Sequence, residues 1–127
     1  MEDVMIRISI LWIFAAVTML AHYALLFFEP DVLKETTTDV NKYLPTMEAF
    51  ANWLIPMTMA FLTVTLEGLT NRYLNMVLGG LYVLLSIFHI AKCPIIHISN
   101  KPSIHQLLVG ISTVVVTALI FWYAWTW

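Results

Sequence analysis

The stretch ISILWIFAAVTMLAHYALLFF, from Ile8 to Phe28, contains 21 residues and no charged side chain. An α-helix needs about 20 predominantly apolar residues to cross roughly 30 Å of hydrocarbon. In lipid every backbone polar group must be paired within the protein, which a helix does internally. The stretch therefore predicts a membrane-spanning helix over about residues 8–28.

Three further apolar stretches follow, over about residues 47–69, 74–91 and 104–125. Strands of a membrane barrel would show shorter alternating segments of about 10 residues, a pattern that these stretches lack. The sequence thus predicts an all-α fold, an integral membrane bundle of four transmembrane helices. Residues 1–127 form a single membrane domain in this prediction, with both termini on the same side.

The composition leads to the same class. Of the 127 residues, 61% are hydrophobic and 11% are charged, and the mean hydropathy is +0.84. A soluble domain is nearer half apolar and a quarter charged. A net charge of −2 provides no basic patch, which argues against a nucleic-acid partner. The single cysteine excludes an internal disulfide. The expected location is multi-pass in a prokaryotic cell membrane, and the expected partners are the lipid bilayer with other membrane subunits or further copies.

The segments between the apolar stretches bear on orientation. The acidic start of the chain is atypical of a signal peptide, so we expect the first helix to be retained. A turn is predicted at Thr70–Tyr73 and a short helix from Pro30. Four lysines lie in the two longer loops, against Arg7 and Arg72 near the termini and the turn, which favours external termini. The aromatic residues expected to mark the interface nearest the termini are Trp12, Tyr73, Trp122, Tyr123, Trp125 and Trp127, and those marking the other interface are Tyr23, Tyr43 and Trp53.

Each stretch carries a row of small or polar residues at helical spacing, which places the row on one face. Such rows are typical of the packed interior of membrane bundles, and ionisable members are functional candidates. For Glu67 we expect pairing with Arg72 or an interfacial position, and for Pro56 a helix kink. The rows comprise Ala15, Thr18, His22 and Glu29; Glu48, Asn52, Pro56, Met59, Thr63 and Glu67; Asn75, Gly79, Tyr82, Ser86, His89 and Cys93; and His105, Ser112, Thr113 and Thr117.

Four spans would bring all the histidines to one side of the membrane. HIAKCPIIHISNKPSIH, from His89 to His105, holds three of the four histidines and the only cysteine. Imidazole and thiolate groups suit transition metals, two histidines can hold a haem, and histidine also handles protons. The spacing matches no standard zinc motif, so an interfacial role stays open. The candidate ligand- or cofactor-binding residues are His22, Glu48, Asn52, His89, Cys93 and His105, of which His22, His89 and His105 are candidate metal ligands.

Three functions remain open. The sequence contains no nucleophile elbow, P-loop, GxGxxG or HExxH motif, which favours a non-enzymatic accessory subunit or a self-associating bundle. The alternative is a bundle that binds a lipid-like or quinone-like molecule, a metal or haem through the histidines, with redox or isomerase chemistry open to it. A third hypothesis is a small transporter, although the mid-helix carboxylate of small multidrug exporters is missing from the first helix.

The segments ISILWIFAAVTML, NRYLNMVLGG and FWYAWTW resemble the corresponding parts of small prokaryotic four-helix membrane proteins of unknown function. The resemblance covers about a third of the chain, and its motifs are mostly aromatic anchors. The resemblance implies the four-helix fold, and it implies no particular activity because none is established for these proteins. The His/Cys segment and AHYALLFFEPD depart from the pattern.

Overall fold

The computed structural model describes residues 2–26, 46–96 and 104–127, and within these ranges the fold consists of helices without strands. The helices are α1 (Glu2–Leu26), α3 (Thr46–Thr65), α4 (Gly68–Ile96) and α5 (Ile104–Thr126). The predicted all-α architecture with four helices is confirmed. The short helix predicted from Pro30 lies outside the described residues.

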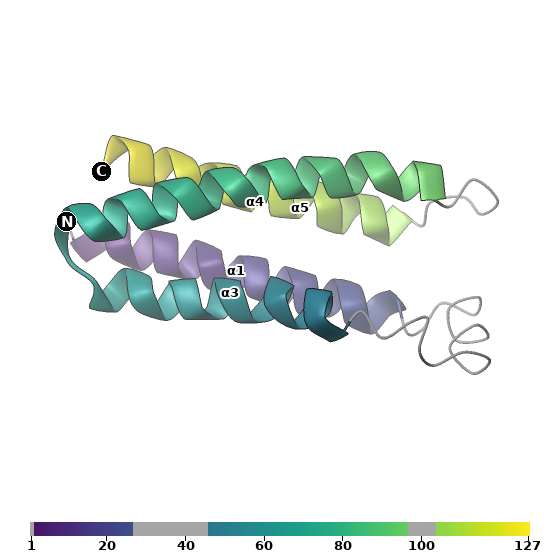
Figure 1. Cartoon of the computed structure of the whole chain (residues 1–127), viewed down its shortest axis with the longest axis horizontal. Coiled ribbons are helices and arrows are strands. Elements are labelled where there is room, and N and C mark those ends of the chain that lie inside the picture. The colour runs from purple at the N-terminus through teal and green to yellow at the C-terminus, as the bar shows by residue number, and fades with distance from the viewer. Residues whose placement is uncertain (1, 27–45, 97–103) are drawn as a thin grey trace.

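The four helices lie side by side in one elongated bundle (Figure 1). Helices α1 and α4 run in one direction, and α3 and α5 run in the other. Both termini lie at the same end as the α3–α4 link, as the sequence predicts, and we call this the terminal end. Contacts are most extensive between α4 and α5 and between α1 and α3, and few between α3 and α4.

The α3–α4 link lies earlier in the chain than predicted. The predicted turn at residues 70–73 falls inside α4, and the link consists of Leu66 and Glu67. Gly68 follows with a φ of 73°, a left-handed conformation that glycine adopts without a steric penalty. The Asn71 Nδ2 group donates to the carbonyl oxygens of Thr63 and Leu66, each at 2.7 Å. Asn71 therefore satisfies carbonyl groups that the end of α3 leaves without helical partners.

Arg72 stabilises the end of α5 instead of pairing with Glu67. Its Nε donates to the carbonyl oxygen of Ala124 at 3.2 Å, and its Nη2 donates to that of Trp125 at 2.8 Å. A cation is favourable there because the last carbonyl groups of a helix carry partial negative charge. Glu67 is exposed, and no ion pair joins it to Arg72, both residues being fully described. Of the two alternatives predicted for Glu67, the ion pair with Arg72 is absent between these two described residues, and the interfacial position stays a prediction.

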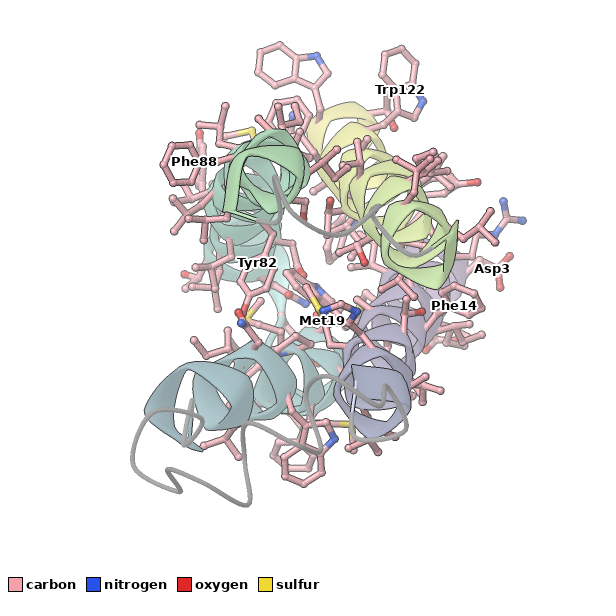
Figure 2. All side chains as sticks on the ribbon, turned by 90° about the vertical axis from the view of Figure 1, so that its right-hand side faces the viewer. Asp3, Phe14, Met19, Tyr82, Phe88 and Trp122 are labelled. Carbon is pink, nitrogen blue, oxygen red and sulfur yellow. The ribbon has the colours of Figure 1, made fainter. Side chains whose placement is uncertain are left out.

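The distribution of polarity is opposite to that of a soluble bundle. Large apolar side chains are exposed on all four helices, for example Phe14 at 53%, Phe61 at 66%, Leu84 at 67% and Leu108 at 59%. Eight polar or titratable residues are buried in the described interior: Ser9, His22, Thr63, Asn71, Asn75, Ser86, Thr113 and Thr117. Seen from the end opposite the termini, many apolar side chains, including Phe14, Phe88 and Trp122, point away from the bundle (Figure 2).

Two of the helices pass a test of length and hydropathy for crossing a membrane. These segments are Glu2–His22 in α1 and Leu107–Thr126 in α5, and each has a mean hydropathy of 2.2. By composition alone, α3 and α4 do not pass the same test in the part of the chain that the structure describes.

Helices α4 and α5 approach most closely at Gly79. A Cβ atom built there would lie 3.1 Å from the backbone nitrogen of Phe121 and 3.1 Å from Cγ2 of Ile120. The neighbouring Gly80 has more room, because a Cβ atom there would meet only the Phe121 ring, at 3.4 Å and beyond. Only hydrogen therefore fits at position 79 without a shift of α5.

The two glycines provide a matched test of this contact. We expect Gly79→Ala to lower the free energy of unfolding by about 1–2 kcal/mol, because overpacking must displace the α5 backbone. Gly80→Ala gains helix propensity without a clash and should be neutral or stabilising by up to about 1 kcal/mol. Reversible unfolding in mixed micelles measures both. Equal effects of the two substitutions would contradict the close approach at Gly79.

Candidate functional site

Most members of the predicted polar rows lie inside the bundle where the structure describes their side chains, whereas Thr18, Asn52 and Ser112 are half-buried. Thr63, Asn75 and Thr117 are 0% exposed, and Thr113, Tyr82 and Ser86 are at most 5% exposed. Glu67 lies in the α3–α4 link and is exposed. Thr113 and Thr117 donate to carbonyl groups of their own helix, so their burial is satisfied locally. Ser9 on α1 donates to the carbonyl oxygen of Ala60 on α3 at 2.8 Å. The other buried polar residues form two groups in the bundle.

The first group, which we call the amide cluster, consists of Trp12, Thr63, Asn71 and Asn75. The side-chain oxygen of Asn75 accepts hydrogen bonds from Trp12 Nε1 at 2.7 Å and from Thr63 Oγ1 at 3.0 Å. Asn75 Nδ2 donates to the side-chain oxygen of Asn71 at 2.7 Å and to its carbonyl oxygen at 2.9 Å. One amide thus connects α1, α3 and α4.

The amide cluster uses its hydrogen-bonding capacity internally. A side-chain amide has two donors and a doubly accepting oxygen, and Asn75 uses all of them within the cluster. Both donors of Asn71 go to the end of α3, and the single Thr63 hydroxyl proton is shared between Asn75 and the carbonyl oxygen of Met59 at 2.6 Å. A fully satisfied buried network makes the core rigid and specifies its packing. The cluster is therefore a structural element with little capacity left for a ligand.

Trp12 was expected at the membrane interface, and that prediction is wrong. The side chain is 0% exposed, and its ring meets Tyr82 edge to face with centroids 5.6 Å apart. The indole N–H reaches Asn75, which explains why a tryptophan can be buried here. Trp122, Trp125 and Tyr73, in contrast, are 60%, 58% and 56% exposed near the terminal end, as an interfacial position requires.

The second group, which we call the hydroxyl layer, consists of His22 on α1 with Tyr82 and Ser86 on α4. His22 is 6% exposed, and Tyr82 and Ser86 are each 5% exposed. The two α4 residues are four apart, so they share one helix face. From the end opposite the termini, Tyr82 and Met19 are seen to extend into the space between the helices (Figure 2).

The helix register places His22 at the level of Ser86. Trp12 and Asn75 are hydrogen-bonded, and α1 and α4 run in the same direction. From Trp12 to His22 the helix advances about 15 Å, and from Asn75 to Ser86 it advances about 16 Å. His22 and Ser86 therefore lie about three helical turns further from the terminal end than Trp12 and Asn75, whereas Tyr82 lies about two turns beyond Asn75 and its ring contacts that of Trp12.

The structure tests the predicted binding set only in part. His22 is buried, as its position in the first polar row implies, and Asn52 on α3 is half-buried. The side chains of Glu48, His89, Cys93 and His105 lie outside the described part of the chain. Among the residues it describes, no group of three or more His, Cys, Asp or Glu could hold a metal. The metal and haem hypotheses stay predictions.

The predicted polar rows indicate neither the buried position of Trp12 nor the inclusion of Asn71 in the interior. The spacing signal for Asn71 was present, because Asn71 precedes Asn75 by four residues and extends the α4 polar row by one turn. Placing the turn at residues 70–73 hid this continuity. For Trp12 no local signal existed, since its partner lies on another helix.

Comparisons of the chain with protein-family models, with curated proteins and with solved structures found no match. The resemblance to small prokaryotic four-helix membrane proteins therefore stays a prediction.

The amide cluster can be tested by a double-mutant cycle. We expect Asn75→Leu to lower the free energy of unfolding by about 2 kcal/mol or more, because Trp12 Nε1 loses its partner and the Asn71 amide loses one. Trp12→Phe combined with Asn75→Leu should show a coupling of about 1 kcal/mol, within the range for interhelical hydrogen bonds in membranes.

Thr117→Val is the matched control for this cycle. The Thr117 hydroxyl bonds only to carbonyl groups of α5, so its loss should cost about 0.5 kcal/mol or less and show no coupling to Trp12. Strict additivity of Trp12→Phe and Asn75→Leu would argue against the interhelical hydrogen bond.

Proposed function

We propose that the protein is an integral membrane protein that crosses the bilayer four times and acts through contacts with other membrane components. Its role would be that of a non-enzymatic accessory subunit or a self-associating bundle in a prokaryotic cell membrane. The observation that carries the proposal is the polarity of the bundle, with large apolar side chains outside and amide, hydroxyl and imidazole groups inside. Exposing apolar side chains over so much of the surface would be unfavourable in water, and patches this extensive are rare on soluble monomers.

The buried polar residues explain why α3 and α4 have lower hydropathy than the other two helices. A hydropathy average counts Thr63, Asn71 and Asn75 as though they faced lipid, whereas all three are 0% exposed. The outward faces of these helices carry side chains such as Phe61, Val77 and Leu84. The surface offered to lipid is thus apolar on α3 and α4 as well, which supports four spans.

The distribution of charge also supports membrane insertion. The charged side chains that the structure describes are Glu2, Asp3, Arg7, Glu67 and Arg72, and all lie near the terminal end. Exposed Tyr73, Trp122 and Trp125 occur near the same end, where aromatic rings favour the boundary between lipid and water. The length of α5, 23 residues, corresponds to about 34 Å, enough to cross the hydrocarbon.

The satisfied interior supports an accessory role over a role in moving ions. The amide cluster fixes three helices through hydrogen bonds that would have to break for a path to open at that level. Near the terminal end, the outer surface of the bundle is available for function, because transmembrane helices of other subunits can pack against it.

Two leucines of α4 provide a direct test of insertion. Leu84 and Leu69 are each 67% exposed, but Leu84 lies near the middle of α4 and Leu69 lies in its first turn. Leu84→Arg should impair insertion by about 2.5–3.5 kcal/mol, whereas Leu69→Arg should be tolerated because it reaches the interface. Membrane fractionation with alkaline extraction measures both variants. Equal recovery of the two arginine variants in a soluble fraction would overturn the membrane proposal.

Association can be tested on protein extracted in mild detergent. We expect the chain to purify with a second membrane protein or as an oligomer, seen by native mass spectrometry and by cross-linking in intact membranes. A chain that is monomeric and alone in both measurements would contradict the accessory and self-associating roles, while leaving membrane insertion unaffected.

A further inference from the structure

The outward face of α1 is a continuous row of aliphatic side chains, which we call the α1 seam. Its members are between 44% and 58% exposed: Ile6, Ile10, Ile13, Val17 and Leu20. Their spacing alternates between four and three residues, so they share one face of the helix. Ile8 and Ala15, which are buried, lie on the opposite face. Phe14, which borders the seam, points away from the bundle (Figure 2).

The side chains of the α1 seam are suited to packing against another helix. In lipid, helices associate through close packing of their surfaces. All members of the seam except Leu20 are β-branched, and such side chains are stiff, so they lose little conformational freedom when they pack. The outward faces of α4 and α5 carry exposed Tyr73, Trp122 and Trp125 near the terminal end, where aromatic rings favour the boundary between lipid and water. The α1 seam is therefore the strongest candidate for a contact between helices.

Two charged residues at the start of α1 match the register of the seam. The seam follows a seven-residue repeat, with Ile10 and Val17 at position a and with Ile6, Ile13 and Leu20 at position d. In the same repeat the exposed Glu2 occupies position g and the exposed Arg7 occupies position e. Residues at g and e of neighbouring parallel helices lie side by side when the e residue comes five positions later, as Arg7 does after Glu2. Two α1 helices in parallel would thus place each Glu2 beside an arginine of the other copy.

We propose that the α1 seam binds the α1 seam of a second copy of this chain. All copies inserted in one membrane have the same orientation, so their α1 helices are parallel when they meet. A two-fold axis along the membrane normal brings identical surfaces together and forms the Glu2–Arg7 pair twice. The inference rests on the proposed membrane location, and it specifies the surface through which the protein would associate with itself.

A matched pair of truncations tests the seam. Ile13→Ala with Val17→Ala removes four side-chain ends from the contact between two copies, so the dissociation constant of the dimer should rise about tenfold. Ile111→Ala with Val115→Ala is the control on α5, because it changes the same residue types at the same spacing and similar exposure, 48% and 52%. The control should alter the dissociation constant by about twofold at most.

The measurement is the concentration dependence of energy transfer between labelled full-length proteins, purified from the membrane fraction and reconstituted in lipid vesicles. Native mass spectrometry gives the number of copies, which we expect to be two. Equal effects of the two double truncations, or a monomeric parent protein, would overturn the proposal.

The charge pair is tested by reversal. Arg7→Glu and Glu2→Arg each place like charges side by side, and each should weaken the dimer about threefold at low salt. The combination of both substitutions restores opposite charges and should return the dissociation constant to that of the parent. A doubly reversed protein as weak as the product of the two single effects would argue against the parallel register.

Cross-linking in native membranes locates the contact directly. The background is Cys93→Ser, which removes the only cysteine of the chain. In this background we expect Ile13→Cys to give a disulfide-linked dimer on oxidation and Ile111→Cys to give none. Cross-linking at position 111 alone, or at neither position, would overturn the α1 contact.

Failure of this proposal is distinguishable from failure of the proposed function. An oligomer, or a complex with another membrane protein, that persists after the Ile13→Ala/Val17→Ala truncation would overturn the α1 contact and keep the accessory or self-associating role. An absence of the protein from the membrane fraction would instead contradict the proposed function.

Discussion

The Asn75 side-chain amide is the interaction on which the arrangement of the helices depends. It accepts from Trp12 on α1 and Thr63 on α3 while donating to Asn71 on its own helix. In hydrocarbon, apolar side chains gain little by leaving lipid for protein, so packing and hydrogen bonds must specify which helices meet. Asn75 does this for three of the four helices. The close approach at Gly79 and the Arg72 contacts to the end of α5 attach the fourth.

The contrast between the amide cluster and the α1 seam gives each a different role. The amide cluster satisfies itself and holds the terminal end together, whereas the α1 seam offers stiff aliphatic side chains to the surroundings of the bundle. The first is what a stable scaffold requires. Both are compatible with a small membrane protein that works through its neighbours, because a partner helix reaches the bundle from its outer surface.

Much of the fold could be predicted from the sequence because the apolar stretches are long and the polar rows recur at helical spacing. The helical character, the common end for the termini and the burial of Thr63, Asn75 and Ser86 all follow from these two patterns. The errors have a common physical cause. Trp12, the α3–α4 link and Arg72 depend on contacts between residues far apart in the chain or on the conformation of one glycine, Gly68, and a periodic pattern contains neither.

The candidate site was only partly accessible to sequence reasoning. His22 stood out because a titratable group in an apolar helix is costly, and its burial agrees with that argument. Tyr82 and Ser86 belong to a polar row, and helical spacing alone does not distinguish their hydroxyl groups from those of the buried threonines. What separates them is whether each hydroxyl finds a protein acceptor, and this depends on the three-dimensional packing. The predicted set of Glu48, His89, Cys93 and His105 remains a hypothesis about the end of the bundle opposite the termini.

The most direct test of the central interaction is the hydrogen exchange of the Trp12 indole N–H, followed by NMR in detergent micelles and assigned by its absence in Trp12→Phe. If Asn75 holds the three helices together, this proton should exchange far more slowly than those of the exposed Trp122 and Trp125, and the protection should disappear in Asn75→Leu. Exchange of the Trp12 proton as rapid as that of Trp125, or protection unchanged in Asn75→Leu, would contradict the account.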